Sequence, residues 1–520
     1  MPIEINKLLR GISSGKTRKP STITSIEAQF TFLSDGTTIP QDYDLLHLEI
    51  TKKLNQIPSA KITFRTRLTA DNRGDEIFYP GKRIRISGGY QGDLEELFEG
   101  KVVKFGIESS KGPRRVVLEL QHDAISLTKG KKNRSFRNMK DSEIWESILH
   151  ANQIIGEPVE TVYTHEKMIQ FGSTDWDFLL ARAEANGRLI RMVRNRVEIF
   201  TPNPNREALL SLQNGPIIQE SELELDAFSQ VAEAAGVTWN PSSQEIDEEK
   251  GAEGNCDTSG KLSGKELAEV VNSGKINLIH GGNRAAEELK SQADNYLMRN
   301  RMAKVKGTFK FMGYPFVDSL GEYLTLASWG DIFDGKALIS GISHHFSIDQ
   351  GWSTQLTIGM PQPSFSDQKS SCADETEGRW SPPVRGLLIG KVIGLENDPQ
   401  GAFRIAVSIP ILESQDQEIW ARIAHPDAGD QRGMIFYPEI GDEVVLGFLN
   451  EDPRDAVILG SLNSSANPSP LTPKDENFKK AIVTKSGMQL VFDEDEISIE
   501  IKTPGGNQIS VNEREKIVMM

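Results

Sequence analysis

Alternating apolar and polar residues dominate two parts of this 520-residue chain, residues 24–124 and the region after residue 384. Alternation with a period of two, interrupted by Gly, Pro, Asn or Asp, predicts short strands. In the first part such stretches are LLHLEITKK, AKITFRTRL, KRIRISGGY and RRVVLELQH. Short strands at this spacing favour an antiparallel barrel or sandwich.

The hydrophobic period changes to that of a helix after residue 140. DSEIWESILHAN (141–152) predicts a helix with Asp141 as its N-cap, and STDWDFLLARAEANG (173–187) predicts one that Thr174 caps. A longer helix is expected over 284–304. The polar, acidic stretch 241–264 before it is expected to be a flexible loop.

Two strand patterns repeat each other. LFEGKVVKFGIESS (97–110) and IFDGKALISGISHH (332–345) match at an offset of 235, which aligns Gly100 with Gly335 and Gly106 with Gly341. Chance similarity of two strand pairs is one explanation. A duplicated β-barrel is the hypothesis that the pattern favours.

Five short strands are expected within residues 384–463, which suits a small closed barrel of the OB type. They are GLLIGKVIGL, FRIAVSIP, IWARIAHP, MIFYP and DEVVLGFL.

The end of the chain, ISIEIKTPGGNQISV (497–511), predicts a hairpin with one apolar face. That face is made of Ile497, Ile499, Ile501, Ile509 and Val511. A lone hairpin of this length is not stable in water, and its open edge invites pairing. Two outcomes remain open: the strands dock on their own chain, or identical strands from several copies wrap together.

Composition and charge narrow the class of protein. Apolar residues make up 37% and charged residues 26%, with a net charge of −15. That charge opposes a general nucleic-acid binder, because phosphate binding needs a basic face. Two basic clusters are expected to be solvated loops: Lys16, Arg18 and Lys19, and then Lys129, Lys131, Lys132, Arg134 and Arg137.

Two cysteines, Cys256 and Cys372, are expected to be free thiols in a reducing compartment. The N-terminal residues have no apolar run of signal-peptide length, and no stretch approaches a membrane span. We therefore expect synthesis and assembly in a cytoplasm without a signal peptide.

No catalytic, cofactor or metal site is expected. His344 and His345 are adjacent in a predicted strand, so their side chains point to opposite faces. No HExxH, CxxC, glycine-rich phosphate loop or GxSxG motif is present. The acidic FDEDE (492–496) lacks the spacing of a calcium loop.

Several ordered motifs resemble one family. YPEIGDEVVLGFLNEDPRDAVILGSLN (437–463) is similar to the OB barrel of VgrG spike proteins and of related phage tail spikes. TKSGMQLVFDEDEISIEIKTPGGNQISV resembles the start of that family's triple-stranded β-helix, and STDWDFLLARAEANGRL and VTWNPSSQE resemble its tail-hub half. The family motif residues of the OB barrel are Trp420, Pro438, Gly441, Asp442, Glu443, Val444 and Gly460.

The resemblance implies a mainly β fold with an α+β hub: two tail-hub-type barrels with helical insertions, an OB-fold barrel, and a short C-terminal triple-stranded β-helix formed in a trimer. The expected boundaries are an N-terminal arm (1–23), first hub barrel (24–130), helical or mixed hub subdomain (131–235), second hub barrel with a helix (236–362), linker (363–383), OB barrel (384–463), hinge (464–480) and the start of the needle (481–520).

The function that the resemblance implies is a non-enzymatic homotrimeric spike at the tip of a contractile injection system. Its expected partners are an inner-tube ring, baseplate proteins, a PAAR-type tip protein and cargo effectors, with transient contact with a target membrane and no specific nucleic acid. The particle is either released from the bacterium or anchored in its envelope. The alternatives are a cell-wall-degrading tail enzyme and an OB-fold module that binds oligonucleotide or sugar.

Overall fold

The computed structural model describes residues 28–66, 73–109, 113–215, 218–254, 256, 258–360, 382–413, 416–513 and 518–519. The expected N-terminal arm, the basic cluster at Lys16 and most of the expected linker lie outside these ranges. The chain divides into two compact units. Unit 1 contains Met1–Gly386, Ile411–Ile419 and Phe448–Ala456, and unit 2 contains Leu387–Pro410, Trp420–Gly447 and Val457–Met520.

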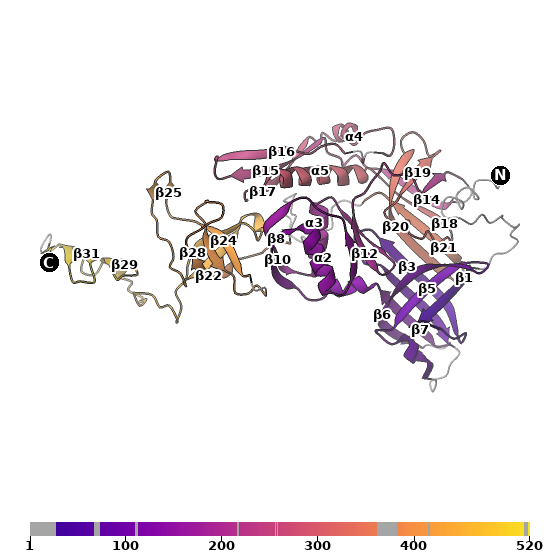
Figure 1. The fold of residues 1–520 in the computed structure, drawn as a ribbon, viewed down its shortest axis with the longest axis horizontal. Helices are drawn as coiled ribbons and strands as arrows, with labels where there is room; N and C mark the ends of the chain where they lie inside the picture. Colours follow the sequence, from indigo (N-terminus) through magenta and orange to yellow (C-terminus); the bar gives the residue numbers. More distant parts are fainter. Residues whose placement is uncertain are drawn as a thin grey trace. The chain divides into compact units, whose positions relative to one another are not determined.

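Thirteen strands of unit 1 form one sheet, whose first half runs from indigo to purple in Figure 1. The strands of the first half are β1 (Ala28–Ser34), β2 (Thr37–Thr38), β3 (Tyr43–Lys53), β4 (Ser59–Thr66), β5 (Arg83–Tyr90), β6 (Asp93–Glu108) and β7 (Arg115–Gln121). Those of the second half are β13 (Leu210–Gln213), β14 (Ile218–Leu225), β18 (Val305–Met312), β19 (Tyr323–Ala327), β20 (Gly335–Ser347) and β21 (Gly351–Ile358). The halves join where β20 pairs antiparallel with β3.

The two halves have equivalent topology. The first is ordered β3-β4-β7-β6-β5-β1, and the second is ordered β14-β18-β21-β20-β19-β13, so each strand has a counterpart at the same place in space and in chain order. The repeated sequences lie on the counterparts β6 and β20, as a duplication predicts. One difference is that β1 pairs antiparallel with β5, whereas β13 pairs parallel with β19.

Each half has its own core, built from the inward residues of alternating strands. Ile62, Ile86 and Leu118 are completely buried in the first half, as are Phe309 and Leu356 in the second.

The second half begins earlier than the expected boundary at residue 236. Strands β13 and β14 precede that boundary, and an insertion separates β14 from β18. The reason is visible in the residues of β14, IQESELEL, which are polar and largely exposed. Only Ile218, Leu223 and Leu225 of β14 pack, partly buried, against the core of the second half, so the apolar pattern of this strand is weak.

The first insertion, between β7 and β13, packs two helices on short strands. The helices are α2 (Asp141–Ala151) and α3 (Asp175–Ala185), and the strands are β8 (Lys132–Lys140), β9 (Ile155–Pro158), β10 (Thr164–Ser173), β11 (Leu189–Val193) and β12 (Arg196–Phe200). The predicted cap of α3 is confirmed, since Thr174 Oγ1 accepts a hydrogen bond from Asp177 N at 3.1 Å. The predicted cap of α2 is wrong: Lys140 is the N-cap, and Asp141 lies in the first turn.

The second insertion is a three-stranded sheet with α5 (Ala286–Met302) packed along it, as Figure 1 shows. Its strands are β15 (Glu233–Asn240), β16 (Glu245–Lys250) and β17 (Lys275–His280), and α4 (Gly264–Val270) precedes β17. The flexible loop predicted for 241–264 is therefore wrong at its start, where β16 pairs with β15. Within the described ranges, no helix combines the length and the apolar character needed to cross a bilayer.

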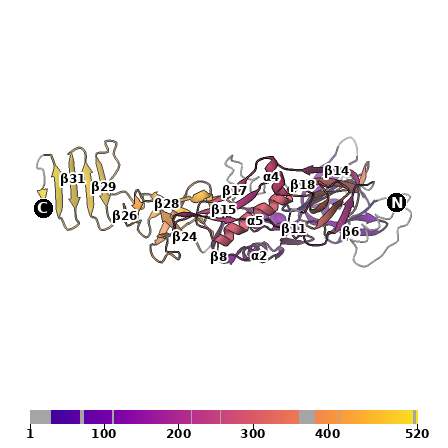
Figure 2. The same cartoon turned by 90° about the horizontal axis from the view of Figure 1, so that it is seen from above.

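Unit 2 contains the expected closed barrel, in the order β22-β23-β24-β28-β27. Its strands are β22 (Leu388–Gly394), β23 (Ile405–Ser408), β24 (Glu418–Ile423), β27 (Glu443–Phe448) and β28 (Ala456–Ser461), with the short pair β25 (Ala428–Gly429) and β26 (Arg432–Gly433) between β24 and β27. A separate antiparallel sheet then forms from β29 (Lys479–Val483), β30 (Gln489–Asp493), β31 (Ser498–Lys502), β32 (Gln508–Asn512) and β33 (Val518–Met519), the yellow row of strands in Figure 2. We call it the terminal sheet.

Buried neutral histidines predict acid lability of unit 1. Burial, with a smaller effect of Lys52, lowers the pKa of His344 to about 3. Burial, with a smaller effect of Arg284, lowers the pKa of His280 to about 4. An unfolded histidine titrates near pH 6.5, so the folded form binds fewer protons below that pH. The free energy of unfolding should therefore fall by about 1.4 kcal/mol per pH unit and per histidine as the pH drops from 6.5 towards 4.

Denaturant unfolding across this pH range checks the expectation. His344→Gln should reduce the slope by about 1.4 kcal/mol per pH unit, whereas His345→Gln, at the half-buried neighbouring position, is the matched control. An unchanged slope in His344→Gln contradicts it.

Candidate functional site

The terminal sheet has one apolar face. The strand register places Ile482 beside Leu490, Phe492 beside Ile499, and Leu490 beside Ile501. Paired residues of neighbouring strands project to the same side. The register of β31 with β32 extends this face, and its apolar members are Ile482, Leu490, Phe492, Ile499, Ile501, Ile509 and Val511.

This apolar face is uncovered on the single chain. Apart from half-buried Leu490, its side chains are between 41% and 49% exposed. The opposite face is mixed: Val491 pairs with Glu500 on it, Lys502 and Ser510 are further members, and Gln508 Nε2 donates to Glu500 Oε1 at 2.9 Å. The exposed contiguous apolar area of the first face is typical of an interaction site.

Four of the five expected needle-core residues lie on this face, and Ile497 lies beside it. Ile497 precedes β31 in a left-handed conformation with φ of 48°. It lines a hollow of about 660 Å³ together with Phe492, Ile499 and Val511. The roles of Ile497, Ile499, Ile501, Ile509 and Val511 in a trimer core remain a prediction. Sequence reasoning missed Ile482, Leu490 and Phe492, because KKAIV and QLVFD each contain three consecutive apolar residues rather than a strict alternation.

The expected OB-motif residues lie on both strands and connections of the barrel. Trp420 is in β24, Gly460 is in β28, and Glu443 and Val444 begin β27, with Val444 fully buried. Pro438, Gly441 and Asp442 form the approach to β27, where Asp442 Oδ2 accepts a hydrogen bond from Glu439 N at 2.9 Å. Gly441 has φ of 101°, which only glycine adopts readily.

A buried ionic cluster in unit 1 holds the segment Phe448–Ala456, which connects β27 to β28. Arg284, just before α5, donates to Asp452 Oδ2 at 2.8 Å and forms a two-pronged pair with Asp455. Arg454 donates to Glu288 Oε1 and to Asp452 Oδ2, both at 2.8 Å. All five side chains are at most 14% exposed.

The charges in this cluster shift the pKa values of Glu288 and Asp455 in opposite directions. Burial opposes ionisation of Glu288, but the Arg454 and Arg284 guanidinium groups lower its pKa to about 2. For Asp455, burial and the neighbouring Asp452 carboxylate keep the pKa above its ordinary value despite Arg284. The ion pairs of the cluster hold the β27–β28 connection in place. In OB-fold binding proteins this connection is one of the loops that contact ligand.

The second part of the basic run 129–137 has a comparable role: the predicted solvated loop holds for the exposed Lys129 and Lys131 but is wrong from Lys132 onward. Residues from Lys132 onward form β8, where Arg134 pairs with the buried Asp175. Arg137 pairs with Asp416 at 2.8 Å, and Lys167 of β10 pairs with the same carboxylate at 2.9 Å. Asp416 belongs to Ile411–Ile419, the other barrel segment that is part of unit 1.

An Asp–His–Arg group in the first insertion has the composition of a catalytic relay. His165 Nε2 is 2.8 Å from Asp141 Oδ2, and Arg182 donates to both oxygens of Asp141 at 2.7 and 2.8 Å. Each of these three side chains is at most 3% exposed. The Arg182 pairing explains why Asp141 does not cap α2, and the group's geometry is that of a core ion pair.

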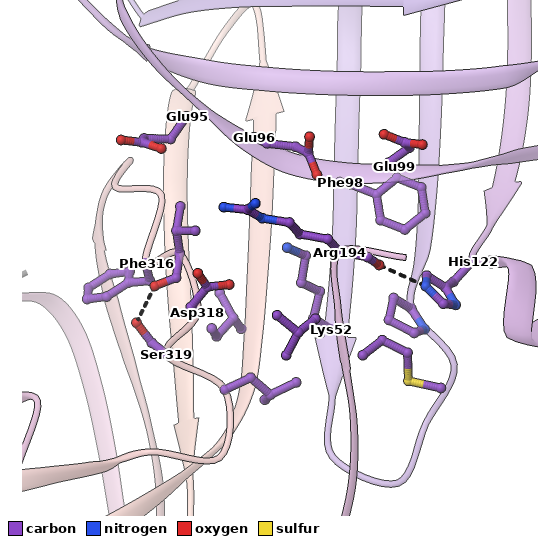
Figure 3. A pocket seen from close by; sticks show the side chains of 16 residues that line it. Lys52, Glu95, Glu96, Phe98, Glu99, His122, Arg194, Phe316, Asp318 and Ser319 are labelled. Carbon is purple, nitrogen blue, oxygen red and sulfur yellow. Dashed lines mark hydrogen bonds between the residues drawn. The ribbon is translucent and has the colours of Figure 1, made fainter. Parts of the chain in front are cut away.

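A small cavity of about 70 Å³ lies near the junction of the two halves of the large sheet, and Figure 3 shows its lining. Lys52 projects into it near Arg194, Glu96 and Asp318. Burial lowers the pKa of Lys52 to about 8, against the opposing effect of Glu96 and Asp318.

The one histidine among the described residues that line this cavity, His122, is not placed for proton transfer. His122 Nε2 donates to the Arg194 carbonyl oxygen at 2.8 Å, and its Nδ1 accepts from Ala124 N at 3.1 Å. Both ring nitrogens are occupied by backbone groups, so the geometry does not pair His122 with a nucleophile.

Among the described residues, no group of three or more His, Cys, Asp or Glu side chains is arranged to hold a metal ion. Cys256 is half-buried against the core of the second half, and Cys372 lies outside the described ranges.

Comparison with protein families gives two matches. Residues 25–347 match the family described as the Alg8 N-terminal domain. Residues 388–462 match the type VI secretion system/phage-baseplate injector OB domain, which coincides with the closed barrel.

Curated relatives share part of the chain. The type VI secretion system spike protein VgrG3 of Vibrio cholerae is 30% identical over 116 residues, which are 20% of this chain and 11% of that protein. The actin cross-linking toxin VgrG1 of Vibrio cholerae is 30% identical over 127 residues, 23% of this chain and 11% of that protein. This chain thus spans only 11% of the length of these relatives.

Solved structures share the fold over most of the chain. VgrG in the Francisella PdpA–VgrG complex covers 99% of this chain and 90% of its own, with a TM-score of 0.59 and 10% identity. A component of the E. coli type VI secretion system covers 83% of this chain and 99% of its own, with a TM-score of 0.52 and 14% identity.

The duplicated sheet, the OB barrel and these matches define a VgrG-like spike protein, with a tail-hub half followed by a phage-baseplate type of barrel. The mainly β class with helical insertions is confirmed. The chain belongs to the family of the Alg8 N-terminal domain, whose match spans more than half of its residues.

The ionic cluster yields a prediction about stability. Arg284→Ala leaves Asp452 and Asp455 buried beside one another with one cation fewer. Breaking a buried pair in this way costs about 3–5 kcal/mol, so the free energy of unfolding of unit 1 should fall by that amount in denaturant titration.

Arg196→Ala is the matched control, because its pair with Glu157 is exposed and lies in unit 1. Exposed pairs contribute about 0–1 kcal/mol. If the two substitutions lower the free energy of unfolding equally, the ionic cluster does not hold the β27–β28 connection in place.

Proposed function

We propose that this protein is a non-enzymatic subunit of a homotrimeric spike and hub at the tip of a contractile injection system. The observation that carries the proposal is the apolar face of the terminal sheet, exposed on the single chain. A one-sided sheet of this kind needs a second surface, and a face of identical chemistry exists on every other copy.

Three copies satisfy the geometry of this sheet. If three terminal sheets wrap around a common axis, the apolar faces meet at the centre and the polar faces, with Glu500 and Lys502, remain in water. The free edges of each sheet then have neighbours, which removes the tendency of open edges to pair at random. The product is a short triple-stranded β-helix with Ile497, Ile499, Ile501, Ile509 and Val511 in its core.

The wider role follows from the class of protein. The names of the relatives, a type VI secretion spike and a component of that system, support a position at the tip of the tube. In this proposal the hub half caps the inner-tube ring next to the baseplate, and the needle end carries a PAAR-type tip. The point pierces a target membrane and delivers effectors, after assembly in the bacterial cytoplasm.

The toxin activity in the name of VgrG1 is not part of this proposal. The similarity to that protein covers 11% of its length. The groups that resemble catalytic ones, at His165 and His122, are bound to Asp141 and Arg182 and to backbone atoms.

The proposal predicts that Ile509→Asp abolishes assembly. Each copy loses a buried side chain worth about 1.5–3 kcal/mol. Over three copies this lowers the association constant of the trimer by about a thousandfold or more. Analytical ultracentrifugation at micromolar concentration should show a trimer for the wild type and a single chain for the variant.

Ser510→Asp is the matched control, because Ser510 is the next residue of β32 and projects to the polar face. It should leave the trimer intact. The proposal is wrong if the wild-type protein has the mass of one chain at these concentrations. It is also wrong if the Ile509→Asp and Ser510→Asp variants dissociate equally.

A further inference from the structure

A second apolar surface in unit 2 lies outside the terminal sheet. The segment Met434–Ile440, here called the apolar segment, follows β26 and leads into β27. Five of its seven side chains are large, apolar and 46–64% exposed: Met434, Ile435, Phe436, Tyr437 and Ile440. Single exposed apolar residues are ordinary in folded proteins, but a run of this kind marks an interface.

The backbone of the apolar segment is also unpaired. It belongs to no strand. Met434 N donates to Asp427 O at 3.0 Å, but the amides and carbonyls of Ile435, Phe436 and Tyr437 bond to no residue in the described part of the chain. Backbone groups that are free in this way can pair with those of a neighbouring chain.

The segment is nevertheless held in place at its end. Gly441 N donates to Val392 O at 2.8 Å, and Val392 N donates to Asp442 O at 3.0 Å. Lys485, in the turn between β29 and β30, pairs with Glu439 at 2.8 Å. The apolar segment is therefore a fixed surface next to the start of the terminal sheet, within the same unit.

The barrel offers a complementary apolar surface, here called the barrel patch: Leu387, Ile389 and Leu459. These side chains are 43–63% exposed. Leu459 and Leu387 lie next to Gly447 of β27, where an added Cβ would lie 3.1 Å from Leu459 Cδ1 and 3.8 Å from Leu387 Cδ2. Ile389 opposes Val445 on the same side of β22 as Leu387. Because Gly447 has no side chain, a shallow depression remains between Leu387 and Leu459.

We propose that the apolar segment of one copy packs on the barrel patch of the next copy in the assembly. The inference rests on the proposed trimer. Contacts between neighbours around a threefold axis are heterologous, so one surface must meet a different one. Unit 2 provides two such surfaces, and both are exposed on the single chain.

A protein partner fits this surface better than a membrane does. Acidic residues flank the apolar segment: Asp427 and Glu439 are paired with Arg432 and Lys485, and Asp430 and Asp442 add negative charge that anionic lipid repels. Unpaired backbone groups are also unfavourable in hydrocarbon, whereas a neighbouring chain supplies hydrogen bonds.

Hydrogen–deuterium exchange on the full chain tests the inference. In the wild-type trimer the amides of Ile435, Phe436 and Tyr437 should exchange at least about 100-fold more slowly than in an unpaired segment. In Ile509→Asp, diluted until its mass is that of one chain, this protection should be lost.

Leu459→Lys should weaken the protection in the trimer, because it places a charge in the barrel patch. Leu462→Lys is its matched control, since Leu462 is an exposed leucine just after β28 that is not part of the patch. Ultracentrifugation of each sample reports the terminal-sheet assembly separately.

Four outcomes overturn the inference. Fast exchange of the three amides in a wild-type trimer rejects it and leaves the proposed function standing, whereas a monomeric wild type rejects both. Protection that persists in the single chain shows that the segment is covered by its own copy. Protection that arises only on adding phosphatidylcholine–phosphatidylglycerol vesicles shows that the segment meets lipid.

Discussion

One constraint organises this molecule: an apolar face on a one-layer sheet cannot stay in contact with water. The terminal sheet pairs Phe492 with Ile499 and Ile501 with Ile509, so the hydrogen bonds between its strands form within one chain while its apolar side chains stay exposed. In the proposed trimer the stability of the last strands is therefore coupled to association. Such coupling makes the stability of the terminal sheet depend on protein concentration.

Unit 1 differs from the terminal sheet, because the charged groups of its ionic cluster are paired within the unit. Arg284, Arg454 and Glu288 are buried with their counter-charges, and the two barrel segments Ile411–Ile419 and Phe448–Ala456 are bound by such pairs. The continuous sheet across β3 and β20 joins the duplicated halves without a flexible linker. In the proposed trimer, two equivalent halves per chain present six similar elements, which matches a threefold spike to a sixfold tube.

Sequence reasoning succeeded where local pattern and structure have the same period. The alternation at 497–511 predicts the apolar face, and the repeat of Gly100 at Gly335 predicts the equivalence of β6 and β20. It failed where partners are distant in the chain. Arg134 and Arg137 read as a solvated run because Asp175 and Asp416, which neutralise them, lie far along the sequence. The acidic strand β16 read as a loop because its pairing with β15, not its composition, makes it a strand.

Ile497 links the local backbone to the assembly. Asp493 Oδ1 accepts hydrogen bonds from Asp495 N and Glu496 N, at 3.1 and 3.2 Å, and this turn delivers Ile497 in a left-handed conformation. That conformation is unfavourable for a β-branched residue and persists only where surrounding contacts require it. On the single chain the side chain is 60% exposed, so nothing there repays the strain. In the proposed trimer, burial of Ile497 against other copies, over the hollow that Phe492 and Val511 line, would stabilise this conformation of the turn.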